Sequence, residues 1–394
     1  MTELTTPSGD FRCLPVDCVS YGAGSIARLM PELQRLGCRR AFVITGHSLA
    51  TQTDLVAKLG ALLGECHAGT YARAGQHVPS ERVIEAAAAA RAVDADCLIS
   101  FGGGSPNDTA KMVAYCLADG IRDANTLVQR GHQPSLTAPP QALLPLIAIS
   151  TTLSAGEFNP SAGVTDERTG VKGRYAMPGL AAKVVILDPE QTIATPDHLW
   201  GATGIKALDH AIERIYAPNH QPLTDACCVA AIQHLLTYLP GSLPAGPETV
   251  ASRGQCQIGA WLSVFGMNNV RTGLSHALGH QIGAGCNVPH GVTSCVTLPH
   301  VILFMGSRVS DRMAIIGKAM DLEGSPGSVA DRVADRVAGL VAKLGLPSRL
   351  RDVGVPEAAL ERVARATATE LNVWPGSDPL LTLDDARALL RRAW

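Results

Sequence analysis

The sequence predicts an α/β domain over residues 1–195, followed by an all-α domain over residues 196–394. In the first part, short apolar runs alternate with glycine-rich turns and helical patterns, as in a doubly wound parallel sheet. From about Thr195 onward the strand signals stop, and helical patterns continue to the C-terminus. A chain of 394 residues is long enough for two such domains, each with its own core.

The expected elements of the first domain alternate along the chain. After a polar lead, residues 21–37 predict a turn and an amphipathic helix that ends at Gly37. Buried strands are expected at 40–45, near Thr70, just before Gly102, at 144–152 and at 182–188, and helices at 51–64, 80–93 and from Ser105.

The second domain is expected to contain helices only, beginning after a boundary near Pro196. Helical periodicity predicts them at 201–216, 222–239, 247–267, 272–285, 292–306, 310–321, 326–345, 356–368 and 382–393.

Composition narrows the class of protein. Hydrophobic residues make up 46% of the chain, charged residues 17%, and the formal net charge is -2, so neither nucleic acid nor an acidic membrane surface is an expected partner. The sequence has no secretory leader pattern and no apolar run of membrane-spanning length. Its eleven cysteines form no CxxC pair, which favours reduced thiols and a cytoplasmic location.

A glycine-rich turn is the first functional signal. Gly102, Gly103 and Gly104 follow an apolar run, and Ser105 and Pro106 open a helix. Glycines let backbone N–H groups approach a phosphate, and a helix N-terminus carries partial positive charge. The turn differs from GxGxxG and is a weak indicator by itself, since many such turns only connect elements.

Three histidines within GLSHALGHQIGAGCNVPHG are the second signal. His276 and His280 are four residues apart and share a helix face, and a turn is expected to bring His290 back toward them. The segment has no carboxylate, so we expect all three imidazoles in a dry pocket on one wall of an interdomain cleft, opposite the glycine-rich turn. Imidazoles can bind metal, transfer protons or donate to an oxyanion, whereas ordinary polar helix residues are the alternative.

The chain resembles the iron-containing (group III) alcohol dehydrogenases and the related maleylacetate reductases over nearly its whole length. The motifs are YGAGSIARL, FGGGSPNDTAK, STTLSAGE, VTDERTGVK, VVILDPEQT, GATGIKALDHAIE, GLSHALGHQIGAGCNVPHGV, LPHVI and DPLLTLDDARALLRRAW. The resemblance implies a dehydroquinate synthase-like fold, a dinucleotide-binding first domain, a homodimer, and hydride transfer between a nicotinamide and an alcohol or carbonyl compound.

The resemblance also implies site residues. By this resemblance, Gly102, Gly103, Gly104 and Ser105 hold the cofactor pyrophosphate, and Asp108 lies in the same turn. Thr151, Thr152 and Lys172 flank the nicotinamide or its ribose. Metal-dependent members bind their ion with one Asp and three His. Here His210, His276 and His290 match the three histidines, His280 matches the histidine beside the nicotinamide, and Lys206 stands at the Asp position.

Lys206, where the metal-dependent members of the family have Asp, determines the mechanism that we predict. An ammonium has no lone pair and repels a divalent ion. Because Lys206 and His210 are four apart, we expect the amine to reach the place of the lost carboxylate, where it and the imidazoles of His210, His276 or His290 form an oxyanion site and His280 or His276 delivers the proton. The alternative is an iron or zinc site of the three histidines with water as fourth ligand.

Two further features bear on substrate and cofactor. STTLSAGE is closer in length to the TTxAGSE form of maleylacetate reductases than to the pattern of metal-dependent relatives, although Ala155 and Gly156 stand where that form has Gly and Ser. The turn of Gly46, His47 and Ser48 has no acidic residue for a ribose 2′-OH, which favours NADP(H) over NAD(H).

The expected reaction is therefore metal-independent reduction of an oxo acid or aldehyde, with a small molecule as the partner. Arg174, Arg271 and Lys206 are candidates for binding a substrate carboxylate. The rival interpretations are an inactive dehydrogenase-like binding protein and a metal-dependent lyase or synthase of the dehydroquinate synthase type. Oxidation of NAD(P)H by an oxo acid or aldehyde would exclude the first rival.

Overall fold

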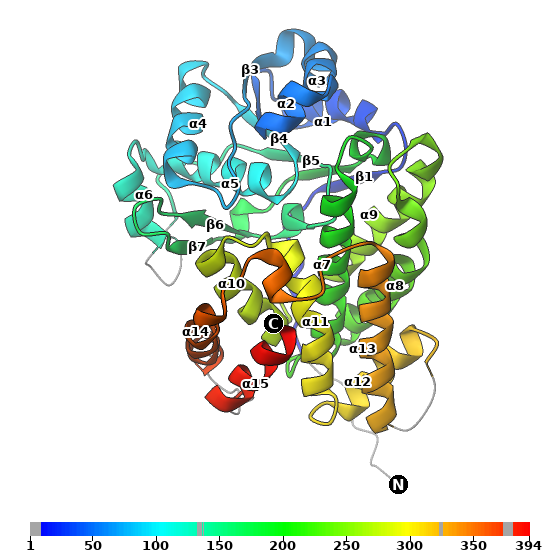
Figure 1. Cartoon of the computed structure of the whole chain (residues 1–394). Coiled ribbons are helices and arrows are strands. Elements are labelled where there is room, and N and C mark those ends of the chain that lie inside the picture. The colour runs from blue at the N-terminus through cyan, green and yellow to red at the C-terminus, as the bar shows by residue number, and fades with distance from the viewer. Residues whose placement is uncertain (1–8, 132–135, 137, 323–325, 373–380) are drawn as a thin grey trace.

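The computed structural model describes residues 9–131, 136, 138–322, 326–372 and 381–394. Its first part is built on a parallel sheet in the order β1-β8-β5-β4-β2-β3. The strands are β1 (Cys18–Tyr21), β2 (Ala41–Thr45), β3 (His67–Tyr71), β4 (Cys97–Gly102), β5 (Leu146–Ser150) and β8 (Val184–Leu187). The predicted fold class, an α/β domain followed by an all-α domain, is confirmed (Figure 1).

Helices cover both faces of this sheet, because alternate strand residues are buried on opposite sides. Ile99, Ile147 and Val184 pack with the helices α1 (Leu29–Arg35) and α3 (Leu55–Leu63). Leu98, Ala148 and Val185 belong to a larger core on the other face, shared with α4 (Ser80–Ala92) and α5 (Gly104–Asp119).

The strand order reverses between β2 and β4. The chain leaves β2 toward the edge strand β3, returns to β4 on the other side of β2, and then continues outward through β5 and β8. Such a switch point places the turns after the two neighbouring strands beside each other, and it is where open α/β sheets bind ligands. Here these turns begin at Gly46 and at Gly103.

Several expectations for the first domain were incomplete. The helix predicted at 51–64 is present as α3, but a separate short helix, α2 (His47–Gln52), precedes it, because the backbone is extended at Thr53. The sequence patterns also missed β1, the helix α6 (Ala124–Gly131) and an antiparallel hairpin of β6 (Ser161–Thr165) and β7 (Lys172–Ala176). The hairpin strands carry Gly163, Gly173 and two exposed basic residues, so they lack a clear apolar alternation.

Each helix predicted after Thr195 is present. They are α7 (Asp197–Ile215), α8 (Pro222–Tyr238), α9 (Val250–Val264), α10 (Leu274–Cys286), α11 (His290–Met305), α12 (Ser310–Ala319), α13 (Pro326–Lys343), α14 (Leu360–Asn372) and α15 (Leu383–Ala393). The proposed domain boundary after residue 195 falls between the end of β8 and the start of α7.

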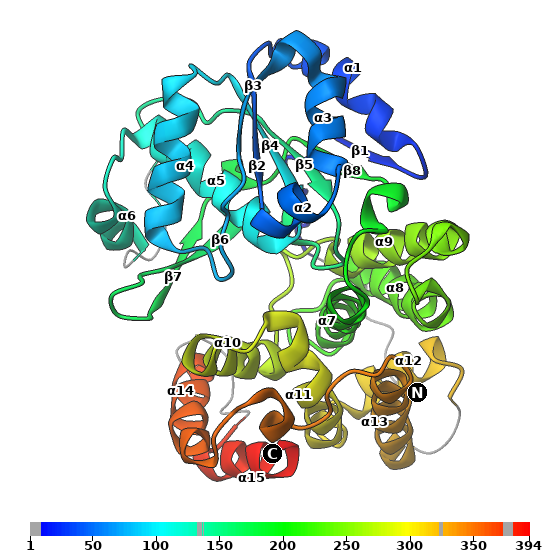
Figure 2. The ribbon, with the colours of Figure 1, turned by 45° about the horizontal axis from the view of Figure 1, so that its top comes forward.

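α7 lies at the centre of the molecule. It is buried over almost its whole length and contacts α8, α9, α10 and α11 (Figures 1 and 2). Apolar side chains such as Trp200, Ile205 and Leu208 account for most of this burial, but polar residues between them are buried too. Within the described ranges, no helix combines the length and the hydropathy needed to cross a bilayer.

Candidate active site

The glycine-rich turn leads from β4 into α5. β4 ends at Gly102, α5 begins at Gly104, and no side chain caps the start of that helix. Gly102 has a φ of 141°, and a Cβ there would lie 3.0 Å from Pro106 Cγ. A Cβ on Gly103 would lie 3.0 Å from Thr152 Cγ2. Side chains larger than glycine would therefore clash at Gly102 and Gly103. The uncapped N-terminus of α5 leaves backbone N–H groups that could bind an anion.

Asp108, predicted in the cofactor turn, makes protein contacts. One carboxylate oxygen accepts from Lys111 Nζ at 3.2 Å, and the other accepts from the Gly163 backbone N–H at 3.2 Å. Lys111 is fully buried and also donates to the carbonyl oxygens of Gly156 and Ser161. These bonds fasten the hairpin and the loop after β5 to α5, and a direct role of Asp108 toward cofactor stays a prediction.

The loop after β5 joins the glycine-rich turn to α7. The Thr151 backbone N–H donates to Gly102 O at 3.0 Å, and the Thr152 side chain lies against Gly103. The Leu153 N–H donates to Thr203 Oγ1 at 3.1 Å, one helical turn before Lys206. Because this loop contacts both elements, the predicted cofactor residues and the buried polar residues of α7 belong to one region.

The turn after β2 lies on the other side of the switch point. Thr45 pairs with Phe101, so Gly46 and Ser48 follow directly beside the end of β4. Ser48 is exposed, and the first turn of α2 contains no acidic residue.

The predicted histidines form a group, as expected, with rings from α7, α10 and α11. The ring centroids are 5.0 Å apart for His210 and His276, 6.1 Å for His276 and His290, and 5.5 Å for His280 and His290. The expectation of a dry pocket for all three imidazoles of the motif is wrong. His276 is buried, but His280 and His290 are exposed because they lie at the surface-facing end of the group.

Glu213 holds His276 and was missed as a site residue. His276 Nδ1 lies 2.5 Å from Glu213 Oε2, and Glu213 also accepts from the backbone N–H groups of Gly273 and Ser275. With Nδ1 engaged by an acceptor, Nε2 of the neutral ring carries the lone pair, and it is buried without a hydrogen-bond partner. The spacing of three residues from His210 placed Glu213 on the same helix face and could have revealed it.

The Lys206 amine points to Asp209, a second residue that sequence reasoning missed. Nζ donates to Asp209 Oδ2 at 3.0 Å and to Ser294 Oγ at 3.2 Å, and Lys206 is only 3% exposed. The same carboxylate oxygen accepts from the hydroxyls of Ser275 and Ser294. The amine is therefore held within the helix core one turn from His210, and the third Nζ proton is left for another acceptor.

The surroundings of His210, His276 and His290 favour the neutral form of the imidazole. Burial, together with the charge of Lys206, lowers the pKa of His276 well below its ordinary value. Burial and the neighbouring charges, that of Lys206 among them, do the same to the pKa of His210. His290 is exposed on one side, but protein atoms crowd its other sides and lower its pKa in the same direction. Neutral rings can each donate from one nitrogen and accept at the other.

The residues present do not fit a divalent ion at the three-histidine position. Lys206, which the resemblance matches to the carboxylate ligand, offers donors only and would repel a cation. In the described chain, the group whose ligand atoms all lie within 4.8 Å of one another is Asp209, Glu213 and His276, not the three imidazoles. That group is already joined by hydrogen bonds from Lys206, Ser275 and His276.

The β6–β7 hairpin brings basic residues toward the histidines. The exposed Lys172 side chain crosses over Gly163, and its charge contributes to the lowered pKa of His290 and of His77. The Arg174 charge acts on Glu370 of α14. Arg271 is exposed, and its backbone N–H donates to Asn219 Oδ1.

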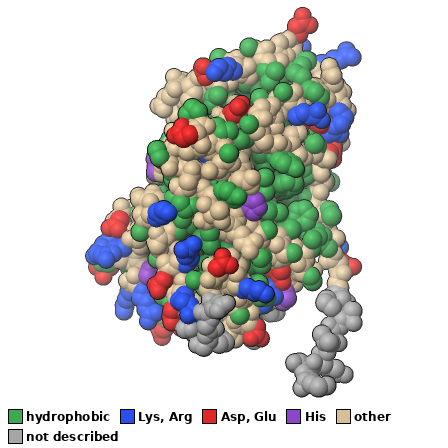
Figure 3. Space-filling model, turned by 90° about the vertical axis from the view of Figure 1, so that its right-hand side faces the viewer, with side chains coloured by type: hydrophobic (Ala, Val, Ile, Leu, Met, Phe, Trp, Pro, Cys, Tyr) green, Lys and Arg blue, Asp and Glu red, His purple; other side chains and the backbone are tan. Residues whose placement is uncertain are grey.

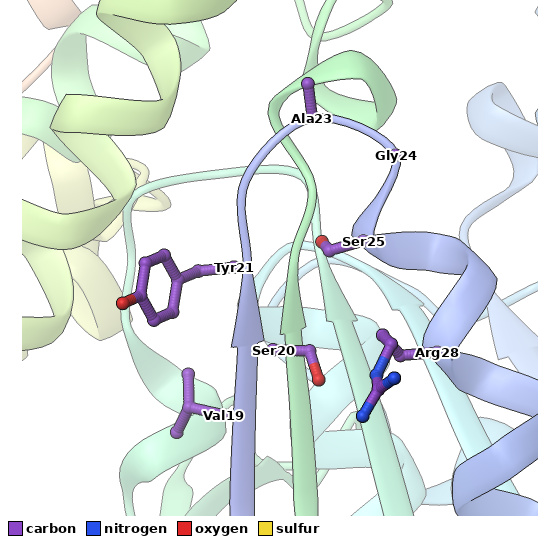
Figure 4. A pocket seen from close by; sticks show the side chains of 7 residues that line it. All are labelled: Val19, Ser20, Tyr21, Ala23, Gly24, Ser25 and Arg28. Carbon is purple, nitrogen blue, oxygen red and sulfur yellow. The ribbon is translucent and has the colours of Figure 1, made fainter.

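A separate surface hollow of about 340 Å³ lies at the end of β1 (Figure 4). Its lining includes Tyr21, Ser25 and Arg28 and none of the predicted site residues.

Comparison with known proteins agrees with this arrangement. The model of the iron-containing alcohol dehydrogenase matches residues 17–189, and the model of the Fe-containing alcohol dehydrogenase family, C-terminal, matches residues 201–394. A maleylacetate reductase of Pseudomonas sp. (strain P51) is 31% identical over 376 residues, which is 95% of each chain. The crystal structure of maleylacetate reductase from Agrobacterium tumefaciens is 28% identical, with a TM-score of 0.79 over 99% of both chains. That of a 1,3-propanediol oxidoreductase is 26% identical, with a TM-score of 0.88 over 98% of this chain and 100% of that one.

Proposed function

Because the chain belongs to the iron-containing alcohol dehydrogenase family and is thus an NAD(P)H-dependent oxidoreductase, we propose that it reduces an oxo acid or aldehyde to an alcohol without a metal ion. The observation that carries this proposal is the buried Lys206 ammonium beside three neutral imidazoles.

The proposal rests on charge. In metal-dependent relatives, one Asp and one divalent ion together contribute a charge of about +1, and Lys206 also carries +1, part of which the Asp209 carboxylate offsets. Hydride addition to a carbonyl carbon moves an electron pair onto oxygen, and a fixed positive charge stabilises that oxygen in the transition state. Neutral His210 and His290 add N–H donors that need no reorganisation.

We propose that the cofactor binds at the switch point of the sheet, between the turns after β2 and β4. A bound nicotinamide nucleotide supplies the hydride. Gly102, Gly103, Gly104 and Ser105 would hold its pyrophosphate, and Thr151, Thr152 and Lys172 would surround its ribose or nicotinamide. The absence of an acidic residue in the first turn of α2 favours NADPH over NADH.

The substrate class follows from two observations. The relatives that are maleylacetate reductases cover 95% of this chain, which makes maleylacetate a candidate. Lys172 and Arg174 on the exposed side of the hairpin supply positive charge near His290 and Glu370, which suits a carboxylate-bearing substrate.

A spectrophotometric screen of NADPH and NADH oxidation with oxo acids and aldehydes, combined with elemental analysis of the purified protein, tests the proposal. We expect activity that survives a chelator and a preparation with less than about 0.1 metal ion per chain. The alternative is a three-histidine iron or zinc site, in which the unpartnered Nε2 of His276 would be a ligand, and a stoichiometric ion required for turnover would establish it.

We also propose a cytoplasmic homodimer. All eleven cysteines are free thiols. Hydrophobic side chains gather on the side of the molecule that carries α8 and α9 (Figure 3), where Leu223 is 49% exposed. Light scattering of the purified protein would measure the mass directly.

A further inference from the structure

We infer that Glu370 is a positioning residue for His280: it fixes the plane and the tautomer of this imidazole, and so makes Nε2 the atom that exchanges a proton with substrate. This inference deepens the proposed reduction and rests on it for the role of His280. The observations that carry it are the contacts between α10 and α14.

Both oxygens of Glu370 are engaged by consecutive residues of α10. His280 Nδ1 lies 2.8 Å from Glu370 Oε1, and Gln281 Nε2 donates to Glu370 Oε2 at 2.9 Å. The side chain of His280 is 51% exposed, so without this partner its ring would have freedom to rotate. The Glu370 side chain is 29% exposed and more confined, which suits a fixed acceptor.

The helix that carries Glu370 is itself held in place. Near its start, Arg362 Nη2 donates to Gly285 O at 3.0 Å, so α14 runs antiparallel to α10 and is attached at both ends of the contact. On its other side, Glu361 accepts two hydrogen bonds from Arg387 of α15, at 2.8 and 2.7 Å. Glu370 therefore meets α10 at a defined position along the helix.

The bond selects a tautomer. A carboxylate only accepts, so Nδ1 of His280 must donate, and Nε2 of the neutral ring keeps the lone pair. The ring stacks on His290, with an interplanar angle of 10°, so this contact uses the face of the ring and not its Nε2. His276 is held in the same way by Glu213, so two histidines on one face of α10 are each fixed through Nδ1 by a glutamate of another helix.

This arrangement suits proton delivery in the reduction. When hydride adds to the carbonyl carbon, the oxygen takes the electron pair of the C=O π bond. The proton on Nε2 of the His280 imidazolium then passes to that oxygen, the N–H bond breaks, and the ring becomes neutral with Nδ1–H still donating to Glu370. Because His280 is exposed, solvent can restore the proton to Nε2.

The test uses Glu370→Ala in the full-length protein with histidine-selective ¹⁵N labelling, with His280→Asn to assign the ring signals. In wild type we expect the Nδ1–H tautomer. In Glu370→Ala we expect the Nε2–H tautomer that predominates in free histidine, and a fall in kcat of about tenfold with the KM for NADPH within twofold. Thr369→Ala, beside Glu370, removes an exposed hydrogen bond to Arg365 O within α14; it is the control and should match wild type in tautomer and kcat.

The inference is overturned if His280 in wild type is not the Nδ1–H tautomer, or if Glu370→Ala keeps both the wild-type tautomer and a kcat within twofold. Should Glu370→Ala not fold, Glu370→Met keeps a similar volume and has no oxygen to accept from His280 Nδ1. The Nε2–H tautomer then supports the inference, and wild-type values of tautomer and kcat reject it. If wild type reduces no carbonyl compound, the proposed function fails, while the tautomer still decides the role of Glu370.

Discussion

Lys206→Met tests whether the buried ammonium stabilises the negative charge that forms on the substrate oxygen. Methionine has a similar length and no charge, so the packing of α7 is largely kept. The Lys206 charge acts on His210, His276 and His290, whose neighbouring ring centroids are 5.0 and 6.1 Å apart. For a substrate oxygen about 5–6 Å from Nζ and an effective dielectric constant of about 20, the lost attraction is about 3 kcal/mol. Asp209, at 3.0 Å from Nζ, cancels part of the field, so we expect a fall in kcat/KM of about 30- to 150-fold.

The same substitution leaves Asp209 without its cation, and an unpaired buried charge destabilises a protein by about 3–5 kcal/mol. Lys206→Met with Asp209→Asn separates the two effects. The double variant should regain most of the lost stability in urea unfolding, since both charges are gone, but not the lost turnover. NADPH oxidation at saturating and limiting carbonyl concentrations gives the comparison. A double variant with wild-type kcat/KM would refute a catalytic role for the ammonium.

Other predictions follow from single features of the site. Lys206→Asp should create tight binding of about one divalent ion per chain, measured by elemental analysis after dialysis; no uptake would mean that the remaining imidazoles cannot form a ligand shell. Gly103→Ala should raise the KM for NADPH at least tenfold with less effect on the carbonyl KM, because the added Cβ would meet Thr152 at 3.0 Å. Ala155 has a φ of 54°, so Ala155→Gly should raise the free energy of unfolding by about 0.5–1 kcal/mol in a urea titration, and a loss of stability would contradict this reading of the turn. The pKa of His210 is lowered in the folded state, so only the unfolded chain binds that proton below about pH 6.5, and stability should fall as the pH drops from 7 to 5.5; His210→Asn should show a shallower slope by up to about 1.4 kcal/mol per pH unit.

The parallel sheet, the helices and the histidine group could be predicted from the sequence, because each depends on a local residue pattern. The apolar runs that became β2, β4, β5 and β8 are bounded by glycine or proline, and α10 follows from its own periodicity. The hairpin was missed since its strands are short and rich in glycine and charge. Pattern also could not say which side of the histidine group faces solvent, so His280 and His290 were expected in a dry pocket.

The partners of the site residues were harder to predict for a different reason. Asp209 lies three residues from Lys206, within reach on one helix, and that spacing could have been used. Glu370 is 90 residues from His280, on a helix whose position depends on the packing of α14 and α15. No local rule links such residues, so a hydrogen bond between them is visible only once the helices are placed.

Replacing an ion by an ammonium changes how many contacts must hold the site together. An ion would orient several imidazoles at once through its coordination geometry. An ammonium makes three hydrogen bonds at most and here uses two of them on Asp209 and Ser294, so it cannot orient the rings. That task falls to carboxylates behind the rings: Glu213 engages Nδ1 of His276, and Glu370 engages Nδ1 of His280. If the site works without a metal, as proposed, it depends on glutamates from α7 and α14 for a geometry that an ion would impose directly.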